Sequence, residues 1–162
     1  QRGGTGVVCK GKIKHYVMGA GGDPTGLGRW TWARIRGKGG MAFRYVSVYC
    51  PCENKEGKIA VWTQHKTYLQ NHHDDRDQRT AFLEDLRASL TQWIEEGDQV
   101  VVCGDLNHDV FSPTIVSLFE GLNMTNLIYD RHDPINAPST YYLNEEGHIV
   151  DGIWGTPGLK GT

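Results

Sequence analysis

The pattern of apolar and polar positions predicts strands at both ends of the chain and in its centre. Aromatic and β-branched residues, which favour extended backbone, dominate residues 30–35 and 42–49. Residues 99–103 are apolar without alternation, which indicates a strand covered on both faces. Shorter apolar stretches predict further strands at residues 6–8, 12–17, 127–129, 140–143 and 148–154. The last two should pair as a hairpin around a four-residue turn, and the glycine-rich residues 19–28 should form a loop.

A longer segment has the period of a helix with one buried face. Its apolar side chains recur at spacings of three and four: Phe82, Leu83, Leu86, Leu90, Trp93 and Ile94. Asp74 or Asp75 could cap the start of this helix, and Gly97 suits the position after its end. A shorter helix is expected at residues 62–69, within a polar surface loop, and another should open at Ser112-Pro113.

The order of these elements predicts one α/β domain over residues 1–162. Strands come first, then a helix, a strand, a second helix and further strands, which fits sheets inside and helices outside. A length of 162 residues is typical of one domain with a core of its own. The 21 glycines favour many turns and strand ends over a helical bundle.

Charge and cysteine content narrow the class of protein. A formal net charge of -2 and a pI near 6.4 argue against a polybasic nucleic-acid binder, but not against an enzyme that meets nucleic acid through a local site and a metal ion. The four cysteines form no Cys-x-x-Cys pair, which favours free thiols over disulfides. With no signal-peptide pattern and no membrane-length apolar run, these thiols predict an intracellular protein of the cytoplasm or nucleus.

The candidate chemistry follows the apolar strand at residues 99–103. Gly104 permits a tight bend, and Asp105 and Asn107 then stand two positions apart, so both can face one side. A carboxylate can accept a proton from water or hold a hard cation, and an amide can donate to a phosphate oxygen. The alternative is that Asp105 and Asn107 are turn formers without a chemical role.

The ordered set of motifs resembles the endonuclease/exonuclease/phosphatase superfamily, which includes DNase I and exonuclease III. The matching segments are residues 2–7, residues 46–51 with their Tyr-Cys-Pro ending, the helix near residues 79–93, Gly104-Asp105-Leu106-Asn107, and Thr140 followed by residues 149–154. The resemblance implies a four-layer α-β-β-α sandwich with two mixed sheets inside, here incomplete at both ends. It also implies a Mg²⁺ or Mn²⁺ cofactor and a DNA substrate, bound by a monomeric domain.

The same resemblance implies roles for five residues. Asp105 would hold the metal and orient or deprotonate the attacking water, and Asn107 would contact the scissile phosphate. Tyr49 would point its hydroxyl at the same phosphate, and Thr140 would support the phosphate pocket. Asp151 would orient a catalytic histidine. Two of these have structural alternatives: Tyr49 as a core aromatic, and Asp151 as a salt-bridge partner.

The family also has a metal-binding Glu before its Gly-Gly-Val strand and a Ser-Asp-His motif after its Ile-Asp segment. This sequence shows neither, so the chain is expected to be an inactive fragment of a longer enzyme. The pattern at Gln64, His65, Arg79, residues 138–140 and residues 151–154 resembles retroelement endonucleases, which accompany a reverse transcriptase.

Two other functions are compatible with the sequence, and one further segment needs an interpretation. One alternative is a phosphatase acting on a phosphoinositide or another small phosphoester, and a second is a non-catalytic scaffold that retains the fold. The His- and Asp-rich residues 65–77 match no metal motif and are expected to be a solvated loop that leads to a helix cap.

Overall fold

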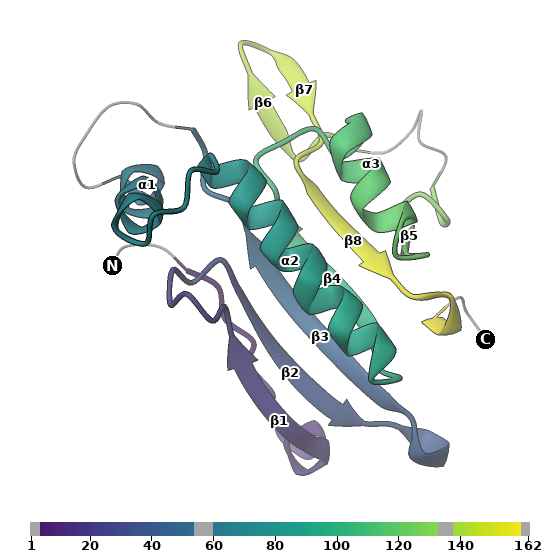
Figure 1. Ribbon diagram of the computed structural model, residues 1–162. Coiled ribbons are helices and arrows are strands. Elements are labelled where there is room, and N and C mark those ends of the chain that lie inside the picture. The colour runs from purple at the N-terminus through teal and green to yellow at the C-terminus, as the bar shows by residue number, and fades with distance from the viewer. Residues whose placement is uncertain (1–3, 54–59, 133–137, 160–162) are drawn as a thin grey trace.

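The computed structural model describes residues 4–53, 60–132 and 138–159 of the chain. Its largest feature is a six-stranded sheet in the order β1-β2-β3-β4-β8-β5 (Figure 1). Only the β3–β4 pair is parallel among these neighbours. The strands of this sheet are β1 (Val17–Gly22), β2 (Trp30–Arg36), β3 (Ala42–Tyr49), β4 (Gln99–Asp105), β5 (Thr125–Asn126) and β8 (Asp151–Gly155).

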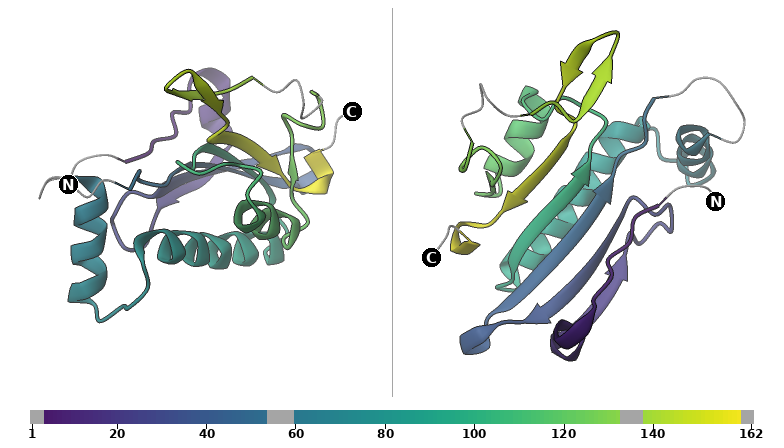
Figure 2. Two further views of the ribbon diagram at one scale, coloured as in Figure 1. Left: turned by 90° about the horizontal axis from the view of Figure 1, so that it is seen from above. Right: turned by 180° about the vertical axis from the view of Figure 1, so that it is seen from behind.

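The remaining elements are helices, short turns of 3-10 helix and a separate two-stranded hairpin. They are α1 (Val61–Asn71), α2 (Gln78–Glu95), α3 (Pro113–Glu120), η1 (Gly11–Tyr16), η2 (Lys38–Gly40), η4 (Pro157–Leu159), β6 (Tyr141–Leu143) and β7 (Glu146–His148). The views in Figure 2 place α2 and α3 on the same face of the sheet. The α/β prediction is therefore confirmed, and the described residues supply one helix layer and one large sheet of the expected sandwich.

The helix α2 forms where the apolar period predicts it. Its N-cap is Asp77, whose carboxylate accepts hydrogen bonds from the backbone N–H groups of Arg79 and Thr80, both at 3.0 Å. The cap predicted at Asp74 or Asp75 is wrong, because the helix starts later and Asp74 is held by Arg76 instead. Beyond the helix, Gly97 has a φ of 86°, as expected of a residue that ends a helix.

The core lies between the sheet and the helices α2 and α3. Side chains of β3 and β4 alternate, so that Val46, Val48, Val100 and Val102 are buried on the helix side. On the other side of β4, Cys103 is only half-buried among the described residues. The predicted cover on both faces of β4 is thus found on one face in this part of the chain.

The N-terminal strands are not where the apolar pattern predicts them. Residues 6–8 form no strand, and residues 12–17 are mostly the 3-10 turn η1. The edge strand β1 instead occupies part of the predicted glycine-rich loop. An ideal Cβ at Gly21 would lie 2.7 Å from the Trp32 ring, so the glycine lets this ring lie against β1. Arg2 and Gly3, part of the family resemblance, lie outside the described residues.

The C-terminal hairpin is shorter than predicted. Its turn consists of Asn144 and Glu145, with φ values of 49° and 68°, the left-handed pair that a two-residue hairpin requires. The predicted strand 148–154 divides, because the backbone changes partners after β7. The Val150 carbonyl accepts from Leu106 N–H at 2.9 Å, and β8 then joins the main sheet. The strand predicted at residues 127–129 is a turn, and β5 precedes it.

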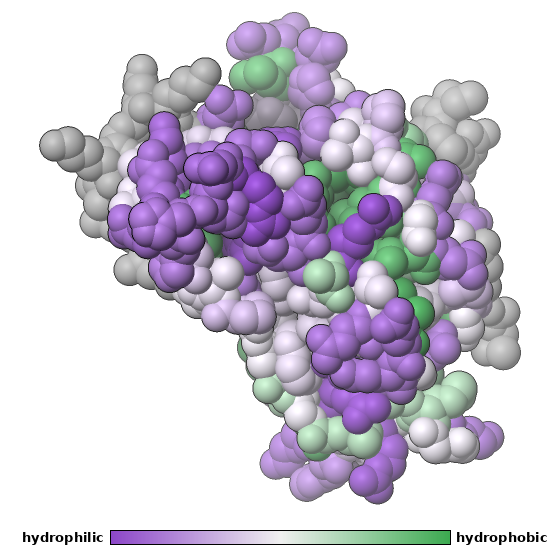
Figure 3. Space-filling view, in the orientation of Figure 1, coloured by the Kyte–Doolittle hydropathy of each residue, from purple (hydrophilic) through white to green (hydrophobic). Residues whose placement is uncertain are grey.

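All four cysteines carry free thiols, as predicted, although only Cys50 is fully buried. Within residues 4–53, 60–132 and 138–159, no helix is both long and apolar enough to cross a bilayer. Figure 3 shows that the surface over α1 and the start of α2 is mainly hydrophilic.

Candidate functional site

Three adjacent strands bring the candidate residues Tyr49, Asp105 and Asp151 into one row. In the sheet register, Asp105 stands beside Tyr49 of β3 on one side and beside Asp151 of β8 on the other. Neighbouring residues across a sheet have Cα atoms roughly 5 Å apart. Strand alternation turns all three away from the face that α2 covers, since Val48, Val102 and Trp154 are buried on that face. The row therefore lies at the carboxyl end of β3 and β4.

Gly104 sets how closely β3 and β4 approach at this row. Its φ is 151°, and an ideal Cβ at this position would lie 1.9 Å from the carbonyl oxygen of Val48. Any side chain would force the two backbones apart. The glycine that the sequence motif places before Asp105 thus keeps this carboxylate beside Tyr49.

The turn after β4 fixes the orientation of the Asp105 carboxylate. The backbone N–H of Asn107 donates to Asp105 Oδ1 at 2.7 Å, and Asn107 Nδ2 donates to Asp105 Oδ2 at 3.2 Å. The same Nδ2 also donates to the carbonyl oxygen of Cys50 at 2.8 Å, which ties the turn to the end of β3. With φ at 45°, Asn107 adopts the left-handed conformation that asparagine tolerates better than most residues. Asn107 therefore acts in this structure as the clamp on Asp105.

Arg79 completes the turn and was not among the site residues predicted from the sequence. Its Nη2 donates to the carbonyl oxygen of Asn107 at 3.2 Å from the first turn of α2. A sequence signal for this contact exists, because Arg79 precedes Leu83 and Leu86 at helical spacing and so extends the buried stripe of α2. That stripe faces the sheet, and its N-terminal end reaches the carboxyl edge of β4.

The row is acidic and lacks a neutralising cation in the part of the chain that the structure describes. Burial raises the pKa of Asp105 above 3.8, the hydrogen bonds from Asn107 oppose this, and the neighbouring charge of Asp151 raises it further. Burial also raises the pKa of Tyr49, and the charge of Asp105 adds to that effect. The Tyr49 hydroxyl thus stays protonated at neutral pH and can donate a hydrogen bond.

Thr140 lies next to Asp151 because its side chain holds the start of β8. Its Oγ1 accepts hydrogen bonds from Val150 N–H at 3.1 Å and from Asp151 N–H at 3.3 Å. The Thr140 hydroxyl proton stays available to a further acceptor. All five residues predicted as site residues are consequently connected through neighbouring strands or hydrogen bonds.

The two carboxylates fit part of the oxygen shell of a hard cation. Asp105 and Asp151 offer oxygen ligands, and the Coulombic cost of placing them side by side is one that a divalent cation would relieve. Mg²⁺ is commonly held by one or two carboxylates together with waters and substrate phosphate. No group of three His, Cys, Asp or Glu side chains suited to a metal occurs within the described ranges.

Burial shifts the pKa of two other reactive side chains near the row, Cys50 and His108. Burial raises the pKa of the Cys50 thiol to about 12, so it remains protonated and is no nucleophile at neutral pH. Burial lowers the pKa of His108, and the positive charge of Arg79 lowers it further. In residues 65–77, Asp74 is paired with Arg76 and Asp77 caps α2, but the predicted solvated loop is wrong for residues 65–71, which belong to α1 and include the buried His65.

Comparison with known proteins identifies the fold. No protein-family model and no curated protein sequence matches the chain. Among solved structures, the 3'-5' exonuclease NExo from Neisseria meningitidis matches with a TM-score of 0.57 and 15% identity, over 86% of this chain and 59% of that one. The human Nocturnin catalytic domain, solved with bound sulfate, matches with a TM-score of 0.52 and 14% identity, over 79% of this chain and 41% of that one.

The Xenopus laevis APE2 catalytic domain gives a third match, with a TM-score of 0.50 and 18% identity, over 82% of this chain and 47% of that one. The chain therefore spans about half the length of the solved structures that it matches. At these identities the likenesses show the fold, and it is the fold that the sequence resemblance to the endonuclease/exonuclease/phosphatase superfamily predicts.

Proposed function

We propose, from the fold shared with that superfamily, that this chain carries the central part of a metal-dependent phosphoester hydrolase, with DNA as its substrate. The observation that carries the proposal is the row of Tyr49, Asp105 and Asp151 at one edge of the sheet. The row combines two neighbouring carboxylates, Asp105 and Asp151, with the protonated hydroxyl of Tyr49. Neither carboxylate forms an ion pair within the described residues. NExo is named as an exonuclease, which supports a nucleic-acid substrate.

Asp105 is the group proposed to handle the attacking water. A raised pKa makes its carboxylate a stronger base than an exposed aspartate, and the two hydrogen bonds from Asn107 fix its direction. Asp105 is also the proposed first ligand of Mg²⁺ or Mn²⁺. When bound, such an ion supplies positive charge that stabilises the phosphate as negative charge builds on its oxygens.

Tyr49, Thr140 and Asn107 are proposed to bind and orient the phosphate. The Tyr49 hydroxyl and the Thr140 hydroxyl donate to its oxygens. Asn107 contacts the phosphate by exchanging its long bond to Asp105 Oδ2 for one to a phosphate oxygen, while it keeps the shorter bond to Cys50. Asp151 keeps its proposed role of orienting a histidine. A retroelement origin is proposed from the sequence pattern alone.

Manganese binding tests this function on the chain itself. Paramagnetic Mn²⁺ should broaden the backbone amide NMR signals of Asp105, Asn107 and Asp151 before any others, and Asp105→Asn should abolish this selectivity. Asp75→Asn removes an exposed carboxylate in the segment between α1 and α2. It is the matched control and should leave the pattern of broadening unchanged. Selective broadening that persists in Asp105→Asn, or the absence of any selective broadening, would favour the non-catalytic scaffold.

A further inference from the structure

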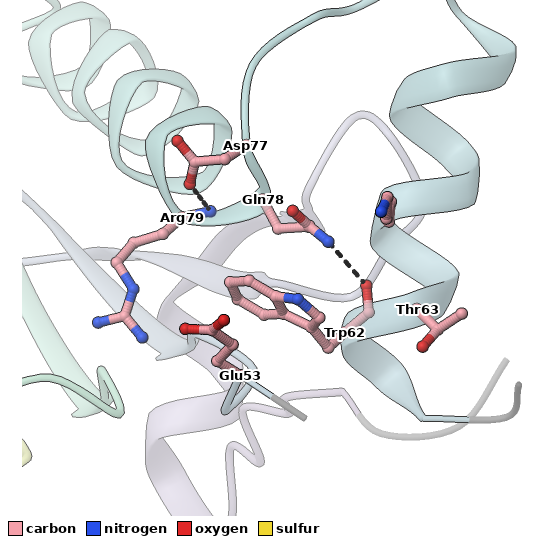
Figure 4. A pocket seen from close by; sticks show the side chains of 7 residues that line it. Glu53, Trp62, Thr63, Asp77, Gln78 and Arg79 are labelled. Atoms are coloured by element: carbon pink, nitrogen blue, oxygen red, sulfur yellow. Dashed lines mark hydrogen bonds between the residues drawn. The ribbon is translucent and has the colours of Figure 1, made fainter. Parts of the chain in front are cut away.

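A cavity of about 710 Å³ lies between α1, the start of α2 and Glu53, which follows β3. Figure 4 shows Trp62 of α1, Gln78 and Arg79 of α2, and Glu53 from the segment after β3 around this space. The roles proposed above use none of these four side chains. The cavity therefore offers a binding surface that the row itself does not account for.

Arg79 connects the cavity to the row. Its side chain lines the cavity and also donates to the carbonyl oxygen of Asn107 at 3.2 Å. The turn that clamps Asp105 is thus one residue away from the cavity wall. One side chain therefore contacts both the cavity and the turn that holds Asp105.

The walls suit a flat ring with polar edges. The half-buried Trp62 presents an indole face to the cavity (Figure 4). Gln78 Nε2 donates to the Trp62 carbonyl oxygen at 3.5 Å, and the Glu53 carboxylate lies on the opposite side of the indole from Gln78 in the same view. An aromatic platform stacks any nucleobase, and carboxylate or amide oxygens accept from the exocyclic amino groups of bases.

The charges of the cavity select against a highly phosphorylated ligand. Among the described residues that line it, Lys66 and Arg79 contribute two positive charges, and Glu53 and Asp77 contribute two negative ones. The Asp77 carboxylate is engaged by the backbone N–H groups at the start of α2. A phosphoinositide headgroup would bring several phosphates against the Glu53 carboxylate, whereas an uncharged base would bring none.

We infer that this cavity is a nucleobase subsite, in which Trp62 stacks on the base of a nucleotide next to the phosphate held at Asp105. The inference rests on the proposed function and makes it more specific, because it assigns a binding site to one base of the DNA substrate. Arg79 contributes to both the base subsite and the proposed phosphate site, because it lines the cavity and donates to the turn that holds Asp105.

Two short single-stranded oligodeoxynucleotides of equal charge test the subsite. One carries normal bases, and the other carries abasic tetrahydrofuran sites on the same backbone. Fluorescence anisotropy with the 162-residue chain should show roughly ten-fold weaker binding of the abasic strand. Trp62→Ala should bring the two affinities together, while Trp62→Phe, which keeps an aromatic face, should retain most of the gap.

Tyr16→Ala is the matched control, because Tyr16 is an exposed aromatic at the opposite end of the sheet from Asp105. It should leave the gap between the two strands unchanged. Equal affinity of the wild-type chain for both strands would overturn the subsite, as would a Trp62→Ala variant that weakens both strands equally. Mn²⁺ broadening at Asp105 is measured independently of oligonucleotide binding. A chain that lacks only the base subsite would still show this broadening, whereas a chain that lacks the metal site would not.

Discussion

The two ends of β4 place an aspartate carboxylate in opposite electrostatic environments. Just before the strand, Asp98 is buried and paired with Arg34 at 2.7 Å and with Arg44 at 2.7 Å. At the end of the strand, Asp105 faces the carboxylate of Asp151 and forms no ion pair in the described part of the chain. Burial alone would raise the pKa of Asp98, but the two arginines outweigh it and hold this pKa below 3.8. The pKa of Asp105 is raised above the same value.

This difference separates a structural carboxylate from a candidate functional one. The Asp98 end is also stabilised by Arg44, whose guanidinium lies 4.4 Å from the Trp32 ring centroid and 4.7 Å from that of Trp93. Its charges are balanced within the fold. The Asp105 end keeps an excess of negative charge beside a protonated hydroxyl, which is costly for stability and useful for binding a cation and a phosphate.

The largest expected effect is at the structural end. Asp98→Asn leaves Arg44, whose side chain is 5% exposed, without its main partner, and should lower the free energy of unfolding by about 3 kcal/mol. Urea denaturation measures this loss. Glu96→Gln is the control, since Glu96 is 41% exposed and also pairs with Arg44, and should cost less than about 1 kcal/mol. Equal costs for the two variants would remove the contrast on which the comparison rests.

A smaller effect is expected where the backbones of β3 and β4 meet. Gly104→Ala places a Cβ against the Val48 carbonyl and should lower the free energy of unfolding by more than about 2 kcal/mol. Gly26→Ala, at another positive φ but with no neighbour within 4 Å, isolates the cost of backbone strain and should lose about 1 kcal/mol. If Gly104→Ala costs no more than Gly26→Ala, close approach of the strands does not position Asp105.

The smallest effect is the opposite pH dependence of the two carboxylates. Because the folded pKa of Asp105 is raised, its ionisation costs stability, and that cost should appear as the pH rises through the window just above 3.8. Because the folded pKa of Asp98 is lowered, its stabilisation should be lost as the pH falls below 3.8. Urea denaturation in metal-free buffer should give wild-type minus Asp105→Asn and wild-type minus Asp98→Asn differences of opposite slope. Slopes of the same sign would contradict the assignment.

The sequence predicts those parts of the fold that depend on local pattern. The strands β2 and β3, the strand β4 and the helix α2 have apolar periods that match their buried faces, so their positions follow from the residues alone. The Gly104 turn is likewise local. The edge strand β1 could not be predicted, because its glycines show no alternation of apolar and polar side chains. A glycine is needed there because the Trp32 ring of the neighbouring strand β2 would meet a Cβ.

The site shows the same limit. The proximity of Asp105 and Asn107 was predictable because one short turn determines their contacts. The contact of Arg79 with Asn107 spans 28 residues, and the Trp62 cavity depends on how α1 packs against α2. The division of residues 148–154 depends on Leu106, which draws Val150 into the main sheet. These features arise from tertiary contacts that a residue pattern does not encode.

The titration of Asp105 tests the central claim most directly. Carboxyl ¹³C NMR of the chain should give Asp105 a pKa above 3.8 in metal-free buffer, and saturating Mg²⁺ should lower that pKa, because a bound cation favours the ionised form. A pKa at or below 3.8 without metal, or one that does not respond to Mg²⁺, would contradict the assignment of this edge of the sheet as a cation-dependent phosphate site.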